Sequence, residues 1–321
     1  MADPNAQDWS NYWSGRAAKG GQDALIRAGI EDSDALEQFW TETLDGFQRD
    51  RSILDLACGA GSALRVASAL GFTSLTGLDI SSDALAELQT RLPNAKTVQA
   101  SVHDTGLASG SFDIVVSQYG VEYAGAQRPE AFAEIARLLS PGGDMIIVAH
   151  IDGGAIAAEC AASLHRADTV LGSGFLDAAD AVIDVIHSNS QNKAQEFDSR
   201  MAALNRSAGV ITQWLGSVDR ERNDFARFVL YLLEGAKRQI VNHASYLEAD
   251  SRAWLRGMEG EVRAYRGRMA SMVQSALSEA DIERLTAPMR EASGMRFDPL
   301  DTLCLKPGDA PAAWIIRGRK P

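Results

Sequence analysis

The sequence has few cysteines, no surplus of positive charge and no long hydrophobic run. Its three cysteines, Cys58, Cys160 and Cys304, are odd in number and far apart, which fits neither a disulfide framework nor the ligand spacing of a metal site. A net charge of −12 argues against binding along a nucleic-acid backbone, which needs an excess of Lys and Arg. No stretch approaches the roughly 18 apolar residues of a membrane span. The expected partner is therefore a small molecule.

The N-terminus and the cysteines also bear on location. The first residues contain no basic segment followed by an apolar one, which a secretory signal would need. Cysteines that do not form the spaced pairs of a disulfide framework are typical of proteins in a reducing compartment. We predict a cytoplasmic protein that binds no metal.

One stretch, from Ile53 to Gly61, organises the rest of the chain. It is a short apolar run that ends in a cluster of small residues, and a helix-forming run up to Leu70 follows at once. Strand, tight turn and helix are predicted in that order. Glycines at 59 and 61 let the backbone approach a ligand where a Cβ would collide, and the helix N-terminus points unpaired N–H groups into the same space. The pattern predicts a nucleotide-type site.

Beyond this stretch, short apolar runs alternate with helical patterns, which is typical of a parallel sheet with crossover helices. Strands are expected at residues 52–56, 74–79, 96–100, 112–117 and 144–150, and helices at 62–70, 83–92 and 129–139. The carboxyl ends of parallel strands meet at one edge of the sheet, so the residues that follow each strand share one crevice. Those residues are the turn at 57–61, Asp79 and Ile80, His103 and Asp104, the segment 117–123, and His150.

The remaining segments define three predicted regions. Residues 1–50 read as an N-terminal helical cap, and 151–295 as a mainly helical insertion rich in amphipathic patterns, either a substrate lid or a dimerisation region. Strand character returns at 300–305 and 312–317, which predicts a hairpin that adds an antiparallel strand to the sheet. Residues 51–150 and 296–321 would then form one α/β domain, a Rossmann-like, mostly parallel seven-stranded sheet with an antiparallel terminal strand.

Four stretches together resemble a class I S-adenosylmethionine-dependent methyltransferase, in particular the ubiquinone and menaquinone C-methyltransferase subgroup. They are residues 54–61, 76–81, 111–123 and 131–143, and the C-terminal hairpin looks like that fold's last two strands. The resemblance implies S-adenosylmethionine as cofactor, held by residues that follow the strands. These are Asp55, Ala57, Gly59, Gly61, Asp79, Ile80, His103, Asp104 and Ser117.

Chemistry gives some of these positions a role beside the resemblance. Asp79, 18 positions after Gly61, lies where an ionised acceptor can take both ribose hydroxyls. Asp55 resembles the acid that holds the amino-acid end of the cofactor, either directly or through the turn. Asp104 would lie near the adenine amine, and His103 is the alternative for that place. Ser117 follows the fourth strand, where the family passes between cofactor and substrate.

Two other functions fit parts of this pattern. A glycine turn with an acid about 20 residues on is also the fingerprint of an NAD-binding oxidoreductase. The third glycine of that fingerprint would fall at Leu64, however, and Asp55 stands just ahead of the turn. A non-catalytic subunit that binds the cofactor or a partner is the second alternative. The intact set of acids and glycines weighs against it.

The predicted reaction is methyl transfer to an O, N or C atom of a small, bulky or largely apolar metabolite such as an aromatic, polyketide-like or isoprenoid compound. Positioning can supply most of the rate, but acceptors often benefit from a base. His150, Glu122 and Tyr119 are the three candidates for that base. A cluster in the insertion, Arg252, Arg256, Arg263, Arg266 and Arg268, indicates either an anionic substrate or a solvated face with paired charges.

Overall fold

The computed structural model describes residues 34–218, 223–305 and 310–321. These form two compact units: one holds the described chain up to Cys160 and from Ala270 onwards, and the other holds Ala161–Met269. The first is an α/β unit and the second is helical. The predicted cap at 1–50 lies largely outside the described residues; its last part is α2 (Asp34–Asp45), which belongs to the α/β unit.

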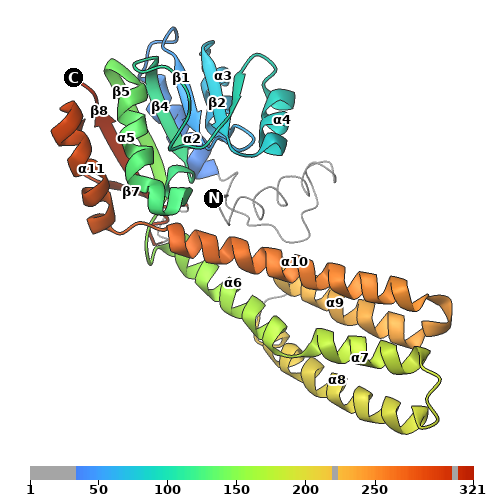
Figure 1. Cartoon of the computed structure of the whole chain (residues 1–321). Coiled ribbons are helices and arrows are strands. Elements are labelled where there is room, and N and C mark those ends of the chain that lie inside the picture. Colours follow the sequence, from blue (N-terminus) through green and yellow to red (C-terminus); the bar gives the residue numbers. More distant parts are fainter. Residues whose placement is uncertain (1–33, 219–222, 306–309) are drawn as a thin grey trace. The chain divides into compact units, whose positions relative to one another are not determined.

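The sheet of the first unit has eight strands (Figure 1) in the order β3-β2-β1-β4-β5-β8-β6, with β7 paired to β8. The bounds are β1 Ile53–Leu56, β2 Leu75–Asp79, β3 Lys96–Gln99, β4 Phe112–Gln118, β5 Leu139–His150, β6 Arg296–Phe297, β7 Asp301–Leu303 and β8 Ala313–Arg319. Strands β1 to β5 are parallel, and β8 runs antiparallel to β5. The predicted mostly parallel sheet with an antiparallel terminal strand is confirmed, with β6 as one short strand more than predicted.

Burial explains why these runs become strands. Every residue of β1 and β2 is buried, as expected for central strands that are covered on both faces. In the core, Trp40 of α2 and Leu64 of α3 (Ser62–Ala69) pack with one set of sheet residues, together with α4 (Ser82–Arg91). Phe132 of α5 (Arg128–Leu138) and Ile282 of α11 (Glu279–Ser293) pack with a different set. The α/β unit is a three-layer sandwich.

Two local features of this unit differ from the predicted pattern. Residues 140–143 fall between the predicted helix 129–139 and the predicted strand 144–150, yet they belong to β5, where the pairing register with β4 shifts between Phe112 and Ile114. After β4, the 3-10 helix η1 (Val121–Gln127), which has a non-helical backbone at Gly125, leads into α5. Beyond the irregular step, β5 continues to His150, at the carboxyl edge of the sheet.

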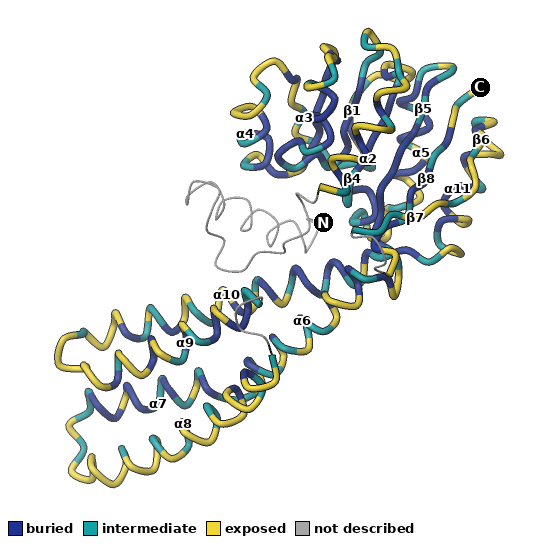
Figure 2. Tube along the Cα trace, turned by 180° about the vertical axis from the view of Figure 1, so that it is seen from behind, coloured by how far each residue is buried: buried dark blue, intermediate teal, exposed yellow. Residues whose placement is uncertain are grey.

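The helical unit is built from long helices. They are α6 (Ala155–Gly172), which begins in the α/β unit, α7 (Phe175–His187), α8 (Lys193–Leu215), α9 (Asp224–Val241), the short η2 (His243–Ser245) and α10 (Glu248–Ser275), which ends in the α/β unit. Figure 2 shows exposed residues along much of α8, where Leu204, Ile211 and Leu215 are the buried ones. The predicted insertion spans 151–295, whereas the compact helical unit spans 161–269 and α11 packs on α5. The role of the helical insertion as a substrate lid or a dimer interface stays a prediction.

Candidate functional site

The glycine turn after β1 has the unusual backbone that its sequence predicts. Ala57, Gly59 and Gly61 all have positive φ, at 54°, 52° and 81°, a region that side chains rarely adopt. The Gly61 N–H donates to the Cys58 carbonyl at 2.8 Å, which closes the turn just before α3. A Cβ at Gly61 would overlap Leu88 Cδ1. Glycine is required here both by φ and by space.

Asp79, at the end of β2, ties this turn to the next one. Its Oδ2 accepts from the Gly59 N–H at 2.9 Å and its Oδ1 accepts from the Ser81 N–H at 2.9 Å. Ser81 is in turn the N-cap of α4, where its hydroxyl accepts from the Ala84 N–H. The carboxylate thus fixes the shape of two adjacent strand ends, and it is 7% exposed.

Asp55 stands beside it and is almost fully buried, with 2% of its surface exposed. Its Oδ1 is buried without a hydrogen-bond partner, a situation that costs about 1–3 kcal/mol for a polar group. Burial, and then the nearby charge of Asp79, raise the pKa of Asp55 well above its usual value. Burial also raises the pKa of Asp79, against backbone hydrogen bonds that lower it. Two buried acids next to the glycine turn favour a cationic ligand there.

The predicted adenine-side residues lie around the ends of β2 and β3. Ile80 follows Asp79 and is 47% exposed, unusual for a large apolar side chain. The His103 Nδ1 lies 2.6 Å from the Ser101 hydroxyl, and Asp104 is exposed. The hydrogen bond to Glu134 and, to a lesser extent, the charge of Asp104 raise the pKa of the Arg137 guanidinium. The exposed isoleucine follows β2 and supplies an apolar surface, and His103 and Asp104 are polar groups that follow β3.

Ser117 joins the ends of β4 and β1. Its hydroxyl donates to the Leu56 carbonyl at 2.8 Å and accepts from the Val121 N–H at 3.2 Å, so both functions of the group are used inside the protein. Gly120, which the sequence reasoning did not single out, lies against the same place: a Cβ there would come within 2.7 Å of Ala57 Cβ and 2.9 Å of the Leu56 carbonyl. A glycine directly after a strand was the available signal.

The structure brings together the three predicted base candidates. His150 Nδ1 lies 2.8 Å from Glu122 Oε1, and the ring of Tyr119 packs against the His150 ring with centroids 4.3 Å apart and the planes inclined by 34°. Glu122 Oε2 and the Tyr119 hydroxyl are both buried without a hydrogen-bond partner. Tyr119 also has a positive φ of 51°. Burial and the neighbouring Glu122 raise the pKa of the Tyr119 phenol.

These residues fit S-adenosylmethionine. The cofactor carries a sulfonium and an ammonium group, and the buried Asp55 oxygen near Asp79, which has no hydrogen-bond partner, is an acceptor that a cationic group would satisfy. A dinucleotide would instead bring an anionic pyrophosphate to the same two acids, which is unfavourable. The glycine turn with Asp55 and Asp79 therefore suits a cationic nucleoside better than an anionic one.

A strand order of 3-2-1-4-5 with an antiparallel β8, a glycine turn after β1 and acids at the ends of β1 and β2 define the class I S-adenosylmethionine-dependent methyltransferase fold. The family described as "Methyltransferase domain" matches residues 54–147. This segment is a class I S-adenosylmethionine-dependent methyltransferase domain, and the resemblance drawn from the sequence is confirmed.

Known proteins similar to this chain match it over about a third of its length. The ubiquinone/menaquinone biosynthesis C-methyltransferase of Campylobacter jejuni is 32% identical over 107 residues, 32% of this chain and 45% of that protein. The malonyl-[acyl-carrier protein] O-methyltransferase of Enterobacter lignolyticus is 34% identical over 96 residues, 30% of this chain and 38% of that protein. The chain thus spans less than half the length of these relatives.

A solved structure aligns over the whole chain. The 1,6-didemethyltoxoflavin-N1-methyltransferase of Burkholderia thailandensis aligns with 100% of this chain and 91% of its own, at 11% identity and a TM-score of 0.48.

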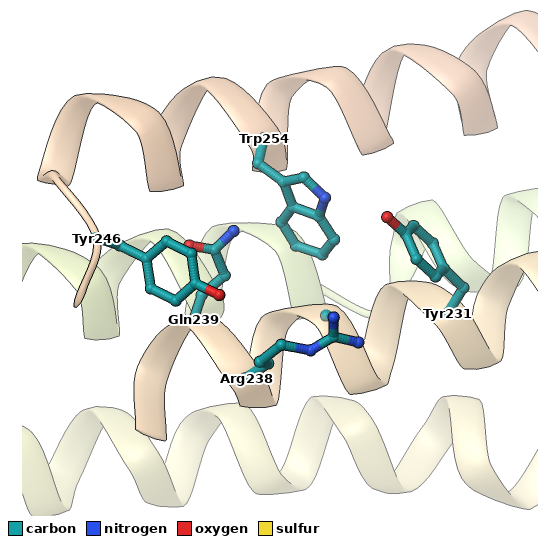
Figure 3. Close-up of a pocket in the computed structure, with 6 residues that line it drawn as sticks. Tyr231, Arg238, Gln239, Tyr246 and Trp254 are labelled. Atoms are coloured by element: carbon teal, nitrogen blue, oxygen red, sulfur yellow. The ribbon is translucent and has the colours of Figure 1, made fainter. Parts of the chain in front are cut away.

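The helical unit has its own small pocket, between α9 and α10 (Figure 3). Aromatic and polar side chains line it: Tyr231, Arg238, Gln239, Tyr246 and Trp254, together with Gly235. The Gln239 side-chain oxygen already accepts from the Ser251 hydroxyl at 2.7 Å. No carboxylate or histidine is among these lining residues, so this pocket offers no acid–base pair for methyl transfer.

The arginine cluster of α10 resolves into ion pairs where its partners are described. Arg252 contacts Asp180 and Asp184 at 2.8 Å each and Glu248 at 2.9 Å. Arg263 pairs with Glu259, and Arg266 with Asp168. These contacts favour the explanation of a solvated face with paired charges over an anionic substrate site.

No helix that the structure describes is long and apolar enough to cross a membrane.

Proposed function

We propose that the protein transfers the methyl group of S-adenosylmethionine to a small organic acceptor. The observation that carries this proposal is the pair of buried acids, Asp55 and Asp79, beside the glycine turn, with one Asp55 oxygen left without a partner. A buried carboxylate oxygen without a partner is expensive, and a cationic ligand would satisfy it. A protein with no such ligand would gain stability by losing the acid.

The residues of the turn would hold the cofactor in distinct ways. Gly59 and Gly61 allow close backbone approach, Asp79 offers oxygens to a ribose diol, and Ile80 offers an apolar surface to an adenine ring. When bound, S-adenosylmethionine supplies a methyl group activated by its positive sulfur. The protein's task is then to exclude water and to orient the acceptor in line with that methyl group.

An aromatic acceptor suits the surroundings best. Tyr119 and Tyr123 lie around the end of β5, where their rings frame His150, and aromatic rings stack favourably on other aromatic rings. The Campylobacter jejuni relative is by name a C-methyltransferase of quinone biosynthesis, which supports a bulky ring compound in this protein too. The cytoplasmic location and a homodimer through the helical unit stay predictions.

A transfer assay tests the proposal. The protein is incubated with methyl-labelled S-adenosylmethionine and a set of ring acceptors, including catechol and reduced menadione, and label in the organic phase is counted. We expect labelled product with the natural protein and background label with Asp79→Ala. Cofactor binding without label in any acceptor would favour a non-catalytic binding subunit.

A further inference from the structure

The edge of the sheet holds a buried acid–base pair, His150 and Glu122. His150 is the last residue of β5, and Glu122 stands in the first turn of η1, after β4. The two side chains are 2% and 0% exposed, and Nδ1 of the imidazole lies 2.8 Å from Glu122 Oε1. The same oxygen accepts from the His150 backbone N–H at 3.3 Å. Two contacts to one oxygen fix the carboxylate and the ring together.

The pair is incompletely satisfied, in contrast to structural carboxylates of the same unit. Glu122 Oε2 is buried without a partner. Glu134, by comparison, accepts from Arg137 and from Thr105 with both of its oxygens engaged. A purely structural Glu122 would be expected to resemble Glu134, because buried polar groups are normally hydrogen-bonded. The partnerless oxygen indicates a role that only a ligand or a transferred proton completes.

The pair is attached to the cofactor turn through one short segment. Gly120 packs against Ala57 and the Leu56 carbonyl so closely that no Cβ fits, and Ser117 donates to that same carbonyl. Tyr119, between them in the sequence, takes a positive φ. Strained backbone of this kind persists where the surrounding structure enforces it, often at active sites. The segment 117–122 therefore sets the position of Glu122 relative to the turn at 57–61.

Few other charges face the imidazole. Tyr119 packs against one face, and Tyr123 meets the ring edge-on with centroids 5.8 Å apart. His150 pairs with Ala313 of the neighbouring strand β8, and the His150 carbonyl accepts from the Leu277 N–H. Asp152 is the next acid along the chain, two residues on. Glu122 is thus the only carboxylate for which the described structure shows a contact with the ring.

We propose that His150 is the base that takes a proton from the methyl acceptor, that Glu122 is its positioning residue, and that the acceptor carries a phenol-type O–H. This rests on the proposed methyl transfer. The O–H proton moves to Nε2, and the electron pair left on the acceptor forms the new bond to the methyl carbon as the carbon–sulfur bond breaks and its electrons stay on sulfur. Glu122 keeps Nδ1 protonated and stabilises the imidazolium, which then releases the proton to water.

The acceptor class follows from what a histidine base can do. Carboxylates are already ionised at neutral pH and need no base, and an aliphatic alcohol is too weak an acid for imidazole. A phenol, with a pKa of about 10 in tyrosine, lies close enough for a histidine to assist. Ionising such a hydroxyl activates both the oxygen and the ring carbon beside it. The proposal therefore holds for O-methylation as written; in C-methylation the ring carbon would also lose its hydrogen as a proton while the oxygen regains one, so that one proton is still released in total.

4-Nitrophenol tests the proton transfer without turnover, because its phenolate and phenol forms absorb differently. The probe is added to protein saturated with S-adenosylhomocysteine, below the pH at which the free probe ionises. We expect the natural protein to bind it enriched in phenolate. Glu122→Gln should lower the bound phenolate-to-phenol ratio about tenfold, and His150→Gln should abolish the enrichment. His165→Gln, a histidine in the helical unit, is the control and should leave the ratio unchanged.

A second measurement needs no variant that must fold well. Nitrogen NMR of the natural protein, which has five histidines, should show one ring, His150, whose Nε2 signal moves on addition of the probe. An unchanged signal, an equal phenolate ratio in all four proteins, or no binding of the probe would each overturn the inference. Failure of the protein to bind S-adenosylhomocysteine in calorimetry would instead overturn the proposed function. Repeating the NMR measurement on cofactor-free protein tests the inference about His150 independently of cofactor binding.

Discussion

The two units of this protein use charge in opposite ways. In the α/β unit, Asp55, Asp79 and Glu122 are buried at the carboxyl edge of the sheet, and two of the three keep an oxygen without a partner. In the helical unit, Arg252, Arg263 and Arg266 lie in ion pairs whose acids are more than a third exposed. Pairs of the second kind contribute little to stability. Buried carboxylates with an oxygen that lacks a partner therefore lie at the proposed ligand site, whereas the exposed ion pairs of the helical unit already have their partners.

A glycine in each unit gives the largest contrast. Gly61→Val forces a β-branched side chain into positive φ and against Leu88, so we expect the free energy of unfolding to fall by about 3–5 kcal/mol. Gly257→Ala, in the interior of α10 with nothing within 4 Å of the added Cβ, should raise it by about 0.5–1 kcal/mol. Urea unfolding followed by circular dichroism checks both. A similar effect at the two sites would mean that the turn is not specially constrained.

Cofactor affinity gives the next contrast. Asp79→Ala removes the acceptor that fixes the turn and that we propose for the ribose hydroxyls, so we expect S-adenosylmethionine to bind about 100-fold more weakly, on the scale of charged hydrogen bonds. Trp254→Ala, in the pocket of the helical unit, should leave the affinity within about twofold. Equilibrium dialysis with labelled cofactor measures both variants. A loss caused by Trp254→Ala would place a binding determinant in the helical unit.

The buried acids also predict an unusual pH dependence. For an acid whose folded-state pKa is raised, the folded protein holds the proton more tightly, so its contribution to stability is lost as pH rises from the usual value of 3.8 through the raised one. Asp55→Asn should therefore stabilise the cofactor-free protein by about 1–2 kcal/mol at neutral pH and by less near about pH 5.

Asp113 is the matched control for this effect. Hydrogen bonds from Ser52 lower its pKa, so its stabilising contribution is lost only as pH falls below the usual value, and Asp113→Asn should destabilise at neutral pH by about 1 kcal/mol. Thermal unfolding across the pH range distinguishes the two signs. If both asparagine variants shifted stability in the same direction, the buried-acid account of Asp55 would be wrong.

Arg252 supplies the smallest effect. Its three carboxylate partners are 44–68% exposed, so Arg252→Ala should lower the free energy of unfolding by less than about 1 kcal/mol, and added salt should shrink the difference. Cofactor affinity should not change. A large, salt-independent loss would show that this network is a structural anchor rather than a solvated face.

The sequence allowed most of the α/β unit to be predicted because its signals are local. Each of the predicted strands has a counterpart within a few residues, since apolar runs bounded by glycine or proline are strong strand signals. The continuation of β5 through residues 140–143 was missed, because its backbone hydrogen bonds join Gly142 and Gly143 to Lys320, far away in the sequence. Local preference loses wherever long-range pairing supplies the hydrogen bonds.

The candidate site, whose role in cofactor binding stays a prediction, could be proposed from residue types but its geometry could not. Asp55, Gly61 and Asp79 could be found from their spacing, whereas the contact between Glu122 and His150 joins residues 28 positions apart and depends on the register of β4 against β5. Which residues of the helical insertion belong to the α/β unit could not be read either, since α10 has the same amphipathic pattern on both sides of the division at 269. The spacing of apolar residues indicates which face of a helix is buried, but not which element covers that face.

The central claim is that the turn and its two acids select a cationic nucleoside. Isothermal calorimetry of the natural protein with S-adenosylmethionine, its demethylated product S-adenosylhomocysteine, which keeps the cationic ammonium group, and NAD⁺ tests this most directly. We predict micromolar binding of the first two and no measurable heat with NAD⁺, because the anionic pyrophosphate would meet Asp55 and Asp79. Binding of NAD⁺, or no binding of either nucleoside, would contradict the account.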